Sequence, residues 1–128
     1  MNKNYLACVI SHGSFGCSLK NAVHKLVVPE TDVCCFSNQD MSLEVIEERI
    51  RELMEARKPD KVFIFVDLVG GSCWLSANRL KKNRDDIFVI GGVNMPMLVS
   101  FHVNLNRLET KALVEKIILD GRKGILSR

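Results

Sequence analysis

The sequence holds 128 residues, and we expect residues 1–128 to form a single domain, since domains commonly contain about 100–200 residues. Hydrophobic residues make up 47% and charged residues 26%, a globular mixture that excludes disordered, collagen-like and coiled-coil chains. The net charge of +3 is too small to indicate a nucleic-acid partner.

The first predicted element, Tyr5–Ile10, is the longest uninterrupted apolar run, at six residues. A bilayer-spanning helix takes about 20 residues, and the apolar core of a signal peptide takes about 7–15. We therefore expect a soluble cytoplasmic protein.

Four short apolar runs predict strands: Tyr5–Ile10, Asp32–Phe36, Val62–Val66 and Ile87–Ile90. These runs are continuous rather than alternating, which is typical of a parallel sheet with both faces covered.

Between the strands, apolar residues recur every three or four positions. This spacing predicts amphipathic helices around residues 19–26, 43–54 and 74–82, and another around 113–118 that ends near Gly121. Ser42 is the expected cap of the second helix and Pro59 its stop, and the tail Gly124–Leu126 is a candidate for a short last strand. The alternation predicts an α/β fold in three layers, with a mainly parallel sheet in the order 2-1-3-4 and helices on both faces.

In such a sheet, chemistry lies just past the carboxyl ends of the strands beside the switch point, here the first and third strands. Ser11–Gly16 follows the first strand and Asp67–Ser72 the third. His12 and Asp67 are therefore expected side by side. A carboxylate that accepts a hydrogen bond from one imidazole nitrogen leaves the other free as a nucleophile, so we take both residues as catalytic candidates.

The turn after the third strand also opens a predicted helix, and amides and a hydroxyl at a helix N-terminus make an anion site. Ser72 as a plain N-cap is the alternative, and both can hold together. We take Gly13, Gly71 and Ser72 as candidates for phosphoryl binding. A nucleophilic histidine beside an anion site indicates phosphoryl transfer through phosphohistidine. His24 is expected on the surface, and His102 is given no catalytic role.

The five cysteines are an odd number without CxxC spacing, so neither a disulfide framework nor a zinc knuckle is expected. Cys8, Cys34 and Cys35 lie in apolar runs and are interpreted as small hydrophobic residues, whereas Cys17 and Cys73 lie near loops. We expect no metal and no cofactor. The basic cluster at residues 79–84 is followed at once by acidic residues, which favours a solvated helix end over a phosphate-backbone patch.

Three motifs together carry a family resemblance: SHGSFG at residues 11–16, FVDLVGGS at 65–72 and GGVNMPML at 91–98. In their order and spacing, the sequence resembles the mannose-type enzyme IIA domain of the bacterial phosphoenolpyruvate-dependent sugar phosphotransferase system. The resemblance covers essentially the whole chain.

The resemblance implies that His12 accepts a phosphoryl group from the phosphocarrier protein HPr and passes it to a IIB component. It implies that Asp67 orients the ring of His12 and that Ser72 lies at the phosphoryl site. It also implies a homodimer in which a C-terminal strand, here Gly124–Leu126, is exchanged between subunits. Contact with a membrane would be indirect, through the transporter complex.

Two departures from the family pattern concern the surface that meets IIB. Cys73 stands where the family usually has proline, and residues 99–101 are Val-Ser-Phe where an acidic residue is common. These changes leave room for a regulatory relative, or for the related phosphodonor subunit of dihydroxyacetone phosphorylation.

Apolar residues in the loops around the reactive centre are candidates for a partner-docking surface: Phe15, Val69, Met95 and Met97. Packing of these loops on the sheet is the alternative for each of them.

Two functions of other classes stay open. A flavodoxin-like module that binds a nucleotide or flavin is disfavoured, because no GxGxxG or P-loop motif follows any predicted strand. A histidine-dependent hydrolase is disfavoured, because the GxSxG nucleophile elbow is absent.

Overall fold

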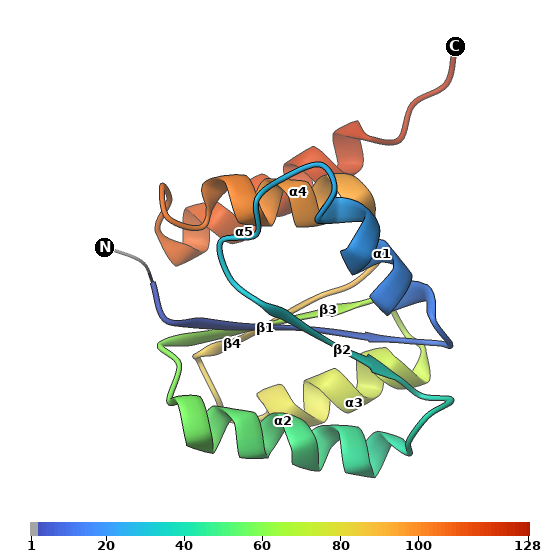
Figure 1. Ribbon diagram of the computed structural model, residues 1–128, viewed down its shortest axis with the longest axis vertical. Coiled ribbons are helices and arrows are strands. Elements are labelled where there is room, and N and C mark those ends of the chain that lie inside the picture. Colours follow the sequence, from blue (N-terminus) through green and yellow to red (C-terminus); the bar gives the residue numbers. More distant parts are fainter. Residues whose placement is uncertain (1–2) are drawn as a thin grey trace.

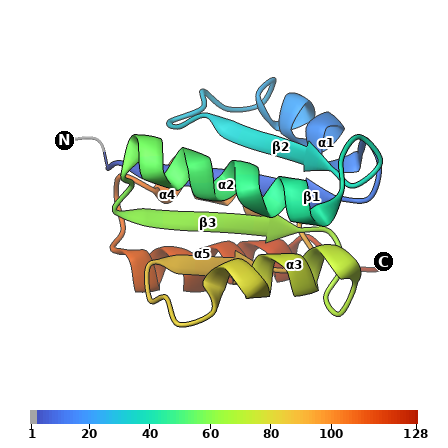
Figure 2. The same ribbon diagram turned by 90° about the horizontal axis from the view of Figure 1, so that it is seen from below.

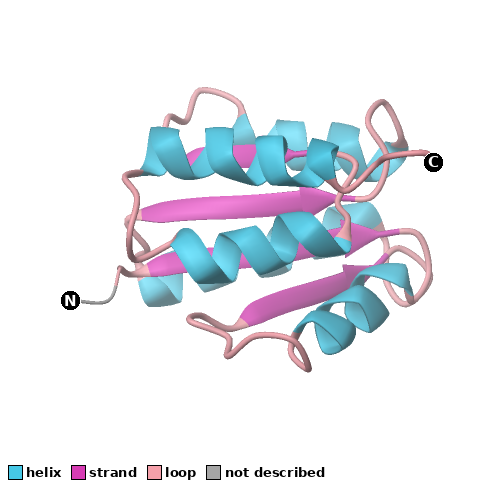
Figure 3. Ribbon diagram, turned by 90° about the horizontal axis from the view of Figure 1, so that it is seen from above, coloured by secondary structure: helices cyan, strands magenta, loops and turns pink. Residues whose placement is uncertain are grey.

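A computed structural model describes residues 3–128 and has a parallel sheet at its centre. The strands are β1 (Tyr5–Ser11), β2 (Val33–Ser37), β3 (Lys61–Val66) and β4 (Ile87–Ile90). Their order across the sheet is β2-β1-β3-β4, which confirms the predicted 2-1-3-4 order. All pairings are parallel, and the arrowheads in Figure 3 point toward one edge of the sheet.

Helices cover both faces of the sheet in a three-layer arrangement, as predicted (Figures 1 and 2). They are α1 (Phe15–Val23), α2 (Leu43–Arg57), α3 (Ser72–Lys81), α4 (Met95–Asn104) and α5 (Thr110–Lys123). In Figure 1, α2 and α3 lie on one face, and α1, α4 and α5 lie on the other. No helix within residues 3–128 combines the length and the apolar character needed to cross a bilayer.

The two faces of β1 bury different residues. Tyr5, Ala7 and Val9 pack with the helices α1, α4 and α5, whereas Leu6, Cys8 and Ile10 pack with α2 and α3. Because side chains alternate along a strand, a sheet covered on both faces requires the continuous apolar runs seen in the sequence.

Helix α4 was not among the predicted helices. Its sequence, MPMLVSFHVN, is apolar on most sides because the helix packs against both the sheet and α5, so the amphipathic period is weak. Its start is nevertheless marked. Asn94 caps the helix by accepting a hydrogen bond from the Met97 amide at 3.0 Å, and Pro96 lies in the first turn.

The tail after α5 is not a strand within the single chain. Ile125 and Leu126 follow the helix as irregular backbone, and their side chains are 76% and 71% exposed. A strand this short needs a hydrogen-bonding neighbour. The tail instead leads away from the sheet of its own chain (Figure 1).

One expectation about the cysteines is wrong. Cys17 in α1 and Cys35 in β2 form a disulfide, with Cα atoms 5.4 Å apart. Cys35 is therefore not a free hydrophobic residue. No spacing rule marks this pair, because the two residues meet only when α1 packs beside the edge strand β2. Three cysteines remain as free thiols: Cys8, Cys34 and Cys73.

Candidate active site

Two neighbouring strands deliver the two predicted catalytic residues to one place. Ile10 of β1 lies opposite Val66 of β3 in the parallel register. His12 directly follows β1 and Asp67 directly follows β3, so both side chains emerge at the carboxyl edge of the sheet. The two side chains lie next to each other, as expected.

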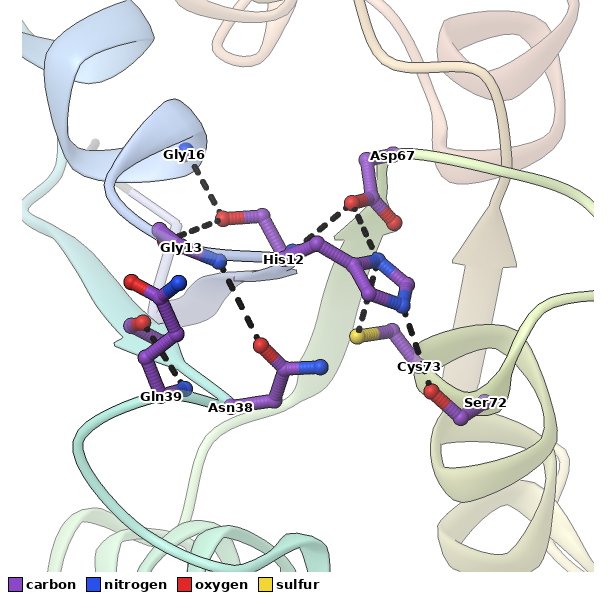
Figure 4. A network of polar contacts seen from close by, with 10 residues as sticks. His12, Gly13, Gly16, Asn38, Gln39, Asp67, Ser72 and Cys73 are labelled. Atoms are coloured by element: carbon purple, nitrogen blue, oxygen red, sulfur yellow. Dashed lines mark hydrogen bonds and ion pairs between the residues drawn. The ribbon is translucent and has the colours of Figure 1, made fainter.

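Asp67 holds His12 at two points (Figure 4). Its Oδ2 accepts from the His12 backbone amide at 2.8 Å and from the ring nitrogen Nδ1 at 2.7 Å. Burial raises the pKa of Asp67, but the hydrogen bonds from His12 outweigh burial and lower it below its usual range. Since an ionised carboxylate only accepts, the neutral imidazole takes the tautomer with its proton on Nδ1 and a lone pair on Nε2.

The free nitrogen of His12 faces the start of α3. Nε2 lies 3.3 Å from the hydroxyl oxygen of Ser72, the first residue of that helix. The first-turn amides of a helix have no intrahelical acceptor, and they favour negative charge. The His12 side chain is 48% exposed, so Nε2 is open to a reaction partner.

The turn that carries His12 is fixed by Ser11. Its hydroxyl accepts from the Gly16 amide at 2.8 Å and donates to the Gly13 carbonyl at 3.3 Å. Gly16 must lack a side chain, because a Cβ there would lie 2.7 Å from a methyl group of Val9. The turn is therefore set by close contacts as well as by hydrogen bonds.

Two of the three predicted phosphoryl-binding residues have their amides engaged elsewhere. The Gly13 amide donates to Asn38 at 3.3 Å. Gly13 has φ 62°, a left-handed backbone conformation that favours glycine, so it serves to shape the turn. The Gly71 amide donates to the Leu68 carbonyl at 3.3 Å, and a Cβ on Gly71 would lie 3.7 Å from the His12 ring. Of the three residues, only Ser72 presents a polar side-chain group to the imidazole.

The apolar loop residues divide into exposed and buried ones. Phe15 and Val69 are 45% and 60% exposed, and Met95 is half-buried. The prediction of Met97 as a docking residue is wrong: its side chain is 4% exposed and belongs to the core, so it cannot form a docking surface. Leu68, 62% exposed in the turn after β3, was missed, although it adjoins Asp67 in the sequence.

Cys73 is the site residue that the sequence analysis did not assign. Its sulfur lies 3.8 Å from His12 Nδ1, on the buried side of the ring (Figure 4). Burial, reinforced by the negative charge of Asp67, raises the pKa of the Cys73 thiol. The available signal was its position directly after Ser72, in the first turn of the helix that faces His12.

The other two histidines lie away from this site. His102 in α4 is 2% exposed, and its Nδ1 accepts from the Glu30 amide at 3.4 Å. Burial, with the neighbouring His24, lowers the pKa of His102 to about 4. His24 is half-buried against His102, with ring centroids 5.6 Å apart, and so does not stand free on the surface.

Comparisons with known proteins identify a matching family and similar solved structures. The family described as "PTS system fructose IIA component" (EIIA-man) matches residues 7–118. A comparison with curated protein sequences finds no match.

Solved structures show the same fold at low sequence identity. Phosphotransferase system component EIIA from Streptococcus agalactiae is 20% identical with a TM-score of 0.84, covering 96% of both chains. The PTS IIA protein associated with the fucose utilization operon from Streptococcus pneumoniae is 20% identical with a TM-score of 0.82, covering 98% of this chain and 94% of that one. The mannose/sorbose specific IIA subunit from Enterococcus faecalis is 17% identical with a TM-score of 0.80, covering 100% and 96%.

The family match extends over most of the chain and includes His12, Asp67 and the start of α3. The chain belongs to the EIIA-man family of phosphotransferase system components.

Proposed function

We propose that this protein carries phosphoryl groups on Nε2 of His12, taking them from phospho-HPr and passing them to a IIB component for sugar uptake. The observation that carries the proposal is the Asp67 hydrogen bond to Nδ1, at 2.7 Å. That bond leaves Nε2 as the unprotonated nitrogen, half-exposed and next to the N-terminus of α3.

The transfer step follows from this tautomer. The Nε2 lone pair of neutral His12 forms a bond to phosphorus as the phosphorus–nitrogen bond of the donor phosphohistidine breaks. The donor imidazole takes the electron pair of that bond. His12 keeps its proton on Nδ1, so its ring becomes positively charged, and the Asp67 carboxylate stabilises that charge.

The phosphoryl oxygens gain partners at the start of α3. The Ser72 hydroxyl lies within reach of Nε2, and the first-turn amides favour a negative group. Onward transfer to IIB reverses the same step, so the site need only bind the phosphoryl group loosely enough for it to leave.

Exposed apolar side chains near His12 support docking of partner proteins. We assign this docking surface to Phe15, Leu68, Val69 and Met95, since the first three are well exposed. Leu68 and Val69 lie in the turn after β3, and Phe15 and Met95 are the first residues of α1 and α4. In this proposal the protein works as a homodimer in the cytoplasm and reaches the membrane only through the transporter complex.

The test is reconstitution. The purified protein is mixed with phosphoenolpyruvate, enzyme I and HPr, and an acid-labile phosphoryl group on this chain is sought by ³¹P NMR and mass spectrometry. Omission of HPr is the control. Absence of label with all components present would overturn the proposal, and label that no IIB component removes would point to a regulatory protein.

A further inference from the structure

Three side chains beside the reactive nitrogen offer a mixed set of metal ligands. The nearest ligand atoms of His12, Asp67 and Cys73 all lie within 4.8 Å of one another. We propose that these residues bind one Zn²⁺ ion, or an ion of similar chemistry, and that the bound ion competes with phosphorylation of His12. The second part rests on the proposed function, and the first part does not.

The donor set selects the class of metal. Nitrogen, carboxylate oxygen and sulfur together suit Zn²⁺, whereas Mg²⁺ and Ca²⁺ take oxygen ligands. A thiolate and a carboxylate also neutralise a double positive charge. The thiol proton of Cys73 leaves on coordination, as at other metal-thiolate sites.

The distance between the nitrogen and sulfur ligands is close to that of a tetrahedral site. Zn–N and Zn–S bonds of about 2.0 and 2.3 Å place nitrogen and sulfur about 3.5 Å apart. The Nδ1 of His12 and the sulfur of Cys73 are already 3.8 Å apart. The imidazole and carboxylate need only separate slightly from their hydrogen bond, and the half-exposed His12 ring has room to do so.

One carboxylate oxygen of Asp67 is available to bind a metal. Its Oδ1 is buried and has no hydrogen-bond partner among residues 3–128, while Oδ2 accepts from the His12 amide. A buried carboxylate oxygen without a partner is costly, and a cation would satisfy it. Oδ1 can therefore bind the metal without disturbing the hydrogen bond that fixes the His12 turn.

The site would be open rather than structural. Three protein ligands leave one tetrahedral position for water, and His12 forms the exposed side of the cluster.

Competition with phosphorylation follows from shared atoms. The metal takes Nδ1, so the ring proton leaves that nitrogen and the neutral ring carries its proton on Nε2, the atom that phosphorylation needs unprotonated. The metal also engages the carboxylate of Asp67, which otherwise stabilises positive charge on the phosphorylated ring. Binding of the metal and of the phosphoryl group then weaken each other by the same factor.

Co²⁺ titration of the oxidised protein, in which Cys17 and Cys35 are bonded to each other, tests the binding. We expect a thiolate-to-cobalt absorption band with one ion per chain, loss of the band on adding Zn²⁺, and no effect of Mg²⁺. The Cys73→Ser variant should lose the band and bind Co²⁺ at least about tenfold more weakly. The matched Cys34→Ser variant should keep both.

Absence of the band in the wild-type protein, or its persistence in Cys73→Ser, would overturn the metal site. Circular dichroism checks the fold, and Cys73→Ala serves if the serine variant does not fold.

In the reconstituted assay, Zn²⁺ should slow labelling of the wild-type protein far more than labelling of Cys73→Ser, and a chelator should restore the rate. Equal slowing of both would refute the competition. A wild-type protein that binds Co²⁺ but is never phosphorylated would refute only the proposed function.

Discussion

Asp67 Oδ2 accepts hydrogen bonds from both the backbone amide and the ring nitrogen Nδ1 of His12, at 2.8 and 2.7 Å. One carboxylate oxygen thus sets the position of the β1–α1 turn and the tautomer of the imidazole together. Since Asp67 directly follows the buried residues 62–66 of β3, the ring orientation is tied to the sheet. The two hydrogen bonds thereby join residues that are 55 positions apart in the sequence.

Replacing His12 should abolish phosphorylation and leave the fold intact. The side chain is half-exposed and lies outside both hydrophobic clusters, so His12→Gln removes the nucleophile without opening the core. Labelling by phospho-HPr is the measurement, with circular dichroism for the fold. His24→Gln is the matched control and should be labelled normally. Persistent labelling of His12→Gln would move the acceptor elsewhere.

Replacing the carboxylate of Asp67 should slow transfer strongly. In Asp67→Asn the shape is kept, but the neutral amide no longer stabilises positive charge on the ring, and the tautomer is less well fixed. We expect a rate at least about a hundredfold lower in single-turnover labelling. Asp86→Asn is the control, because Asp86 pairs with Arg84 on the surface. An unchanged rate in Asp67→Asn would contradict the assigned role.

Much of the fold could be predicted because the buried strands have continuous apolar sequences. The four strands and their order follow from those runs and from the handedness of crossovers. Helix α4 could not be found by periodicity, since it is apolar on most sides. Met97 was mistaken for a surface residue for the same reason: in an apolar loop sequence, only the packing of α4 on α5 shows which side chains are buried.

The site was predictable to the extent that strand ends determine it. His12 and Asp67 were found because parallel strands bring their carboxyl ends together. Cys73 was not, since its approach to His12 depends on the direction of the first turn of α3. The disulfide between Cys17 and Cys35 likewise depends on where α1 rests against the edge strand.

His102 should make the protein less stable in mild acid. Burial, with the adjacent His24, lowers its pKa from 6.5 to about 4. Between about pH 6.5 and pH 4 this histidine binds a proton in the unfolded chain but not in the folded chain. The free energy of unfolding therefore falls as the pH falls through this range. We expect a loss of about 2 kcal/mol between pH 7 and pH 5, measured by urea denaturation.

The variant His102→Gln separates this effect from other titrations. Glutamine can still accept from the Glu30 amide but does not titrate, so the variant should lose most of that pH dependence. Besides Glu30, the charged or titratable groups around the ring are His24 and Arg107. His12→Gln is the control and should keep the slope. A slope that survives in His102→Gln would assign the effect to another group.

The disulfide should contribute measurably to stability. Cys17 and Cys35 are 18 positions apart, and closing a loop of that length in the unfolded chain corresponds to about 3 kcal/mol. The Cys17→Ser/Cys35→Ser double variant should therefore unfold at lower urea concentration than the oxidised protein. Cys34→Ser, which removes a free thiol on the same strand, should change little. Five reactive thiols in the denatured, unreduced protein would contradict the pairing.

The tail should join two copies of the chain. Ile125 lines a groove with Trp74 and Val89 beside β4, which is an edge strand. The exposed tail residues have no strand partner among residues 3–128 of their own chain. Pairing the tail with β4 of a second copy would satisfy the hydrogen bonds of the tail backbone and cover that edge.

Because α5 continues to Lys123, the informative truncation follows Gly124 rather than Gly121. Removal of residues 125–128 should give monomers in sedimentation velocity, whereas removal of residues 127–128 should leave the dimer. A stable dimer after the longer truncation would show that the interface lies elsewhere.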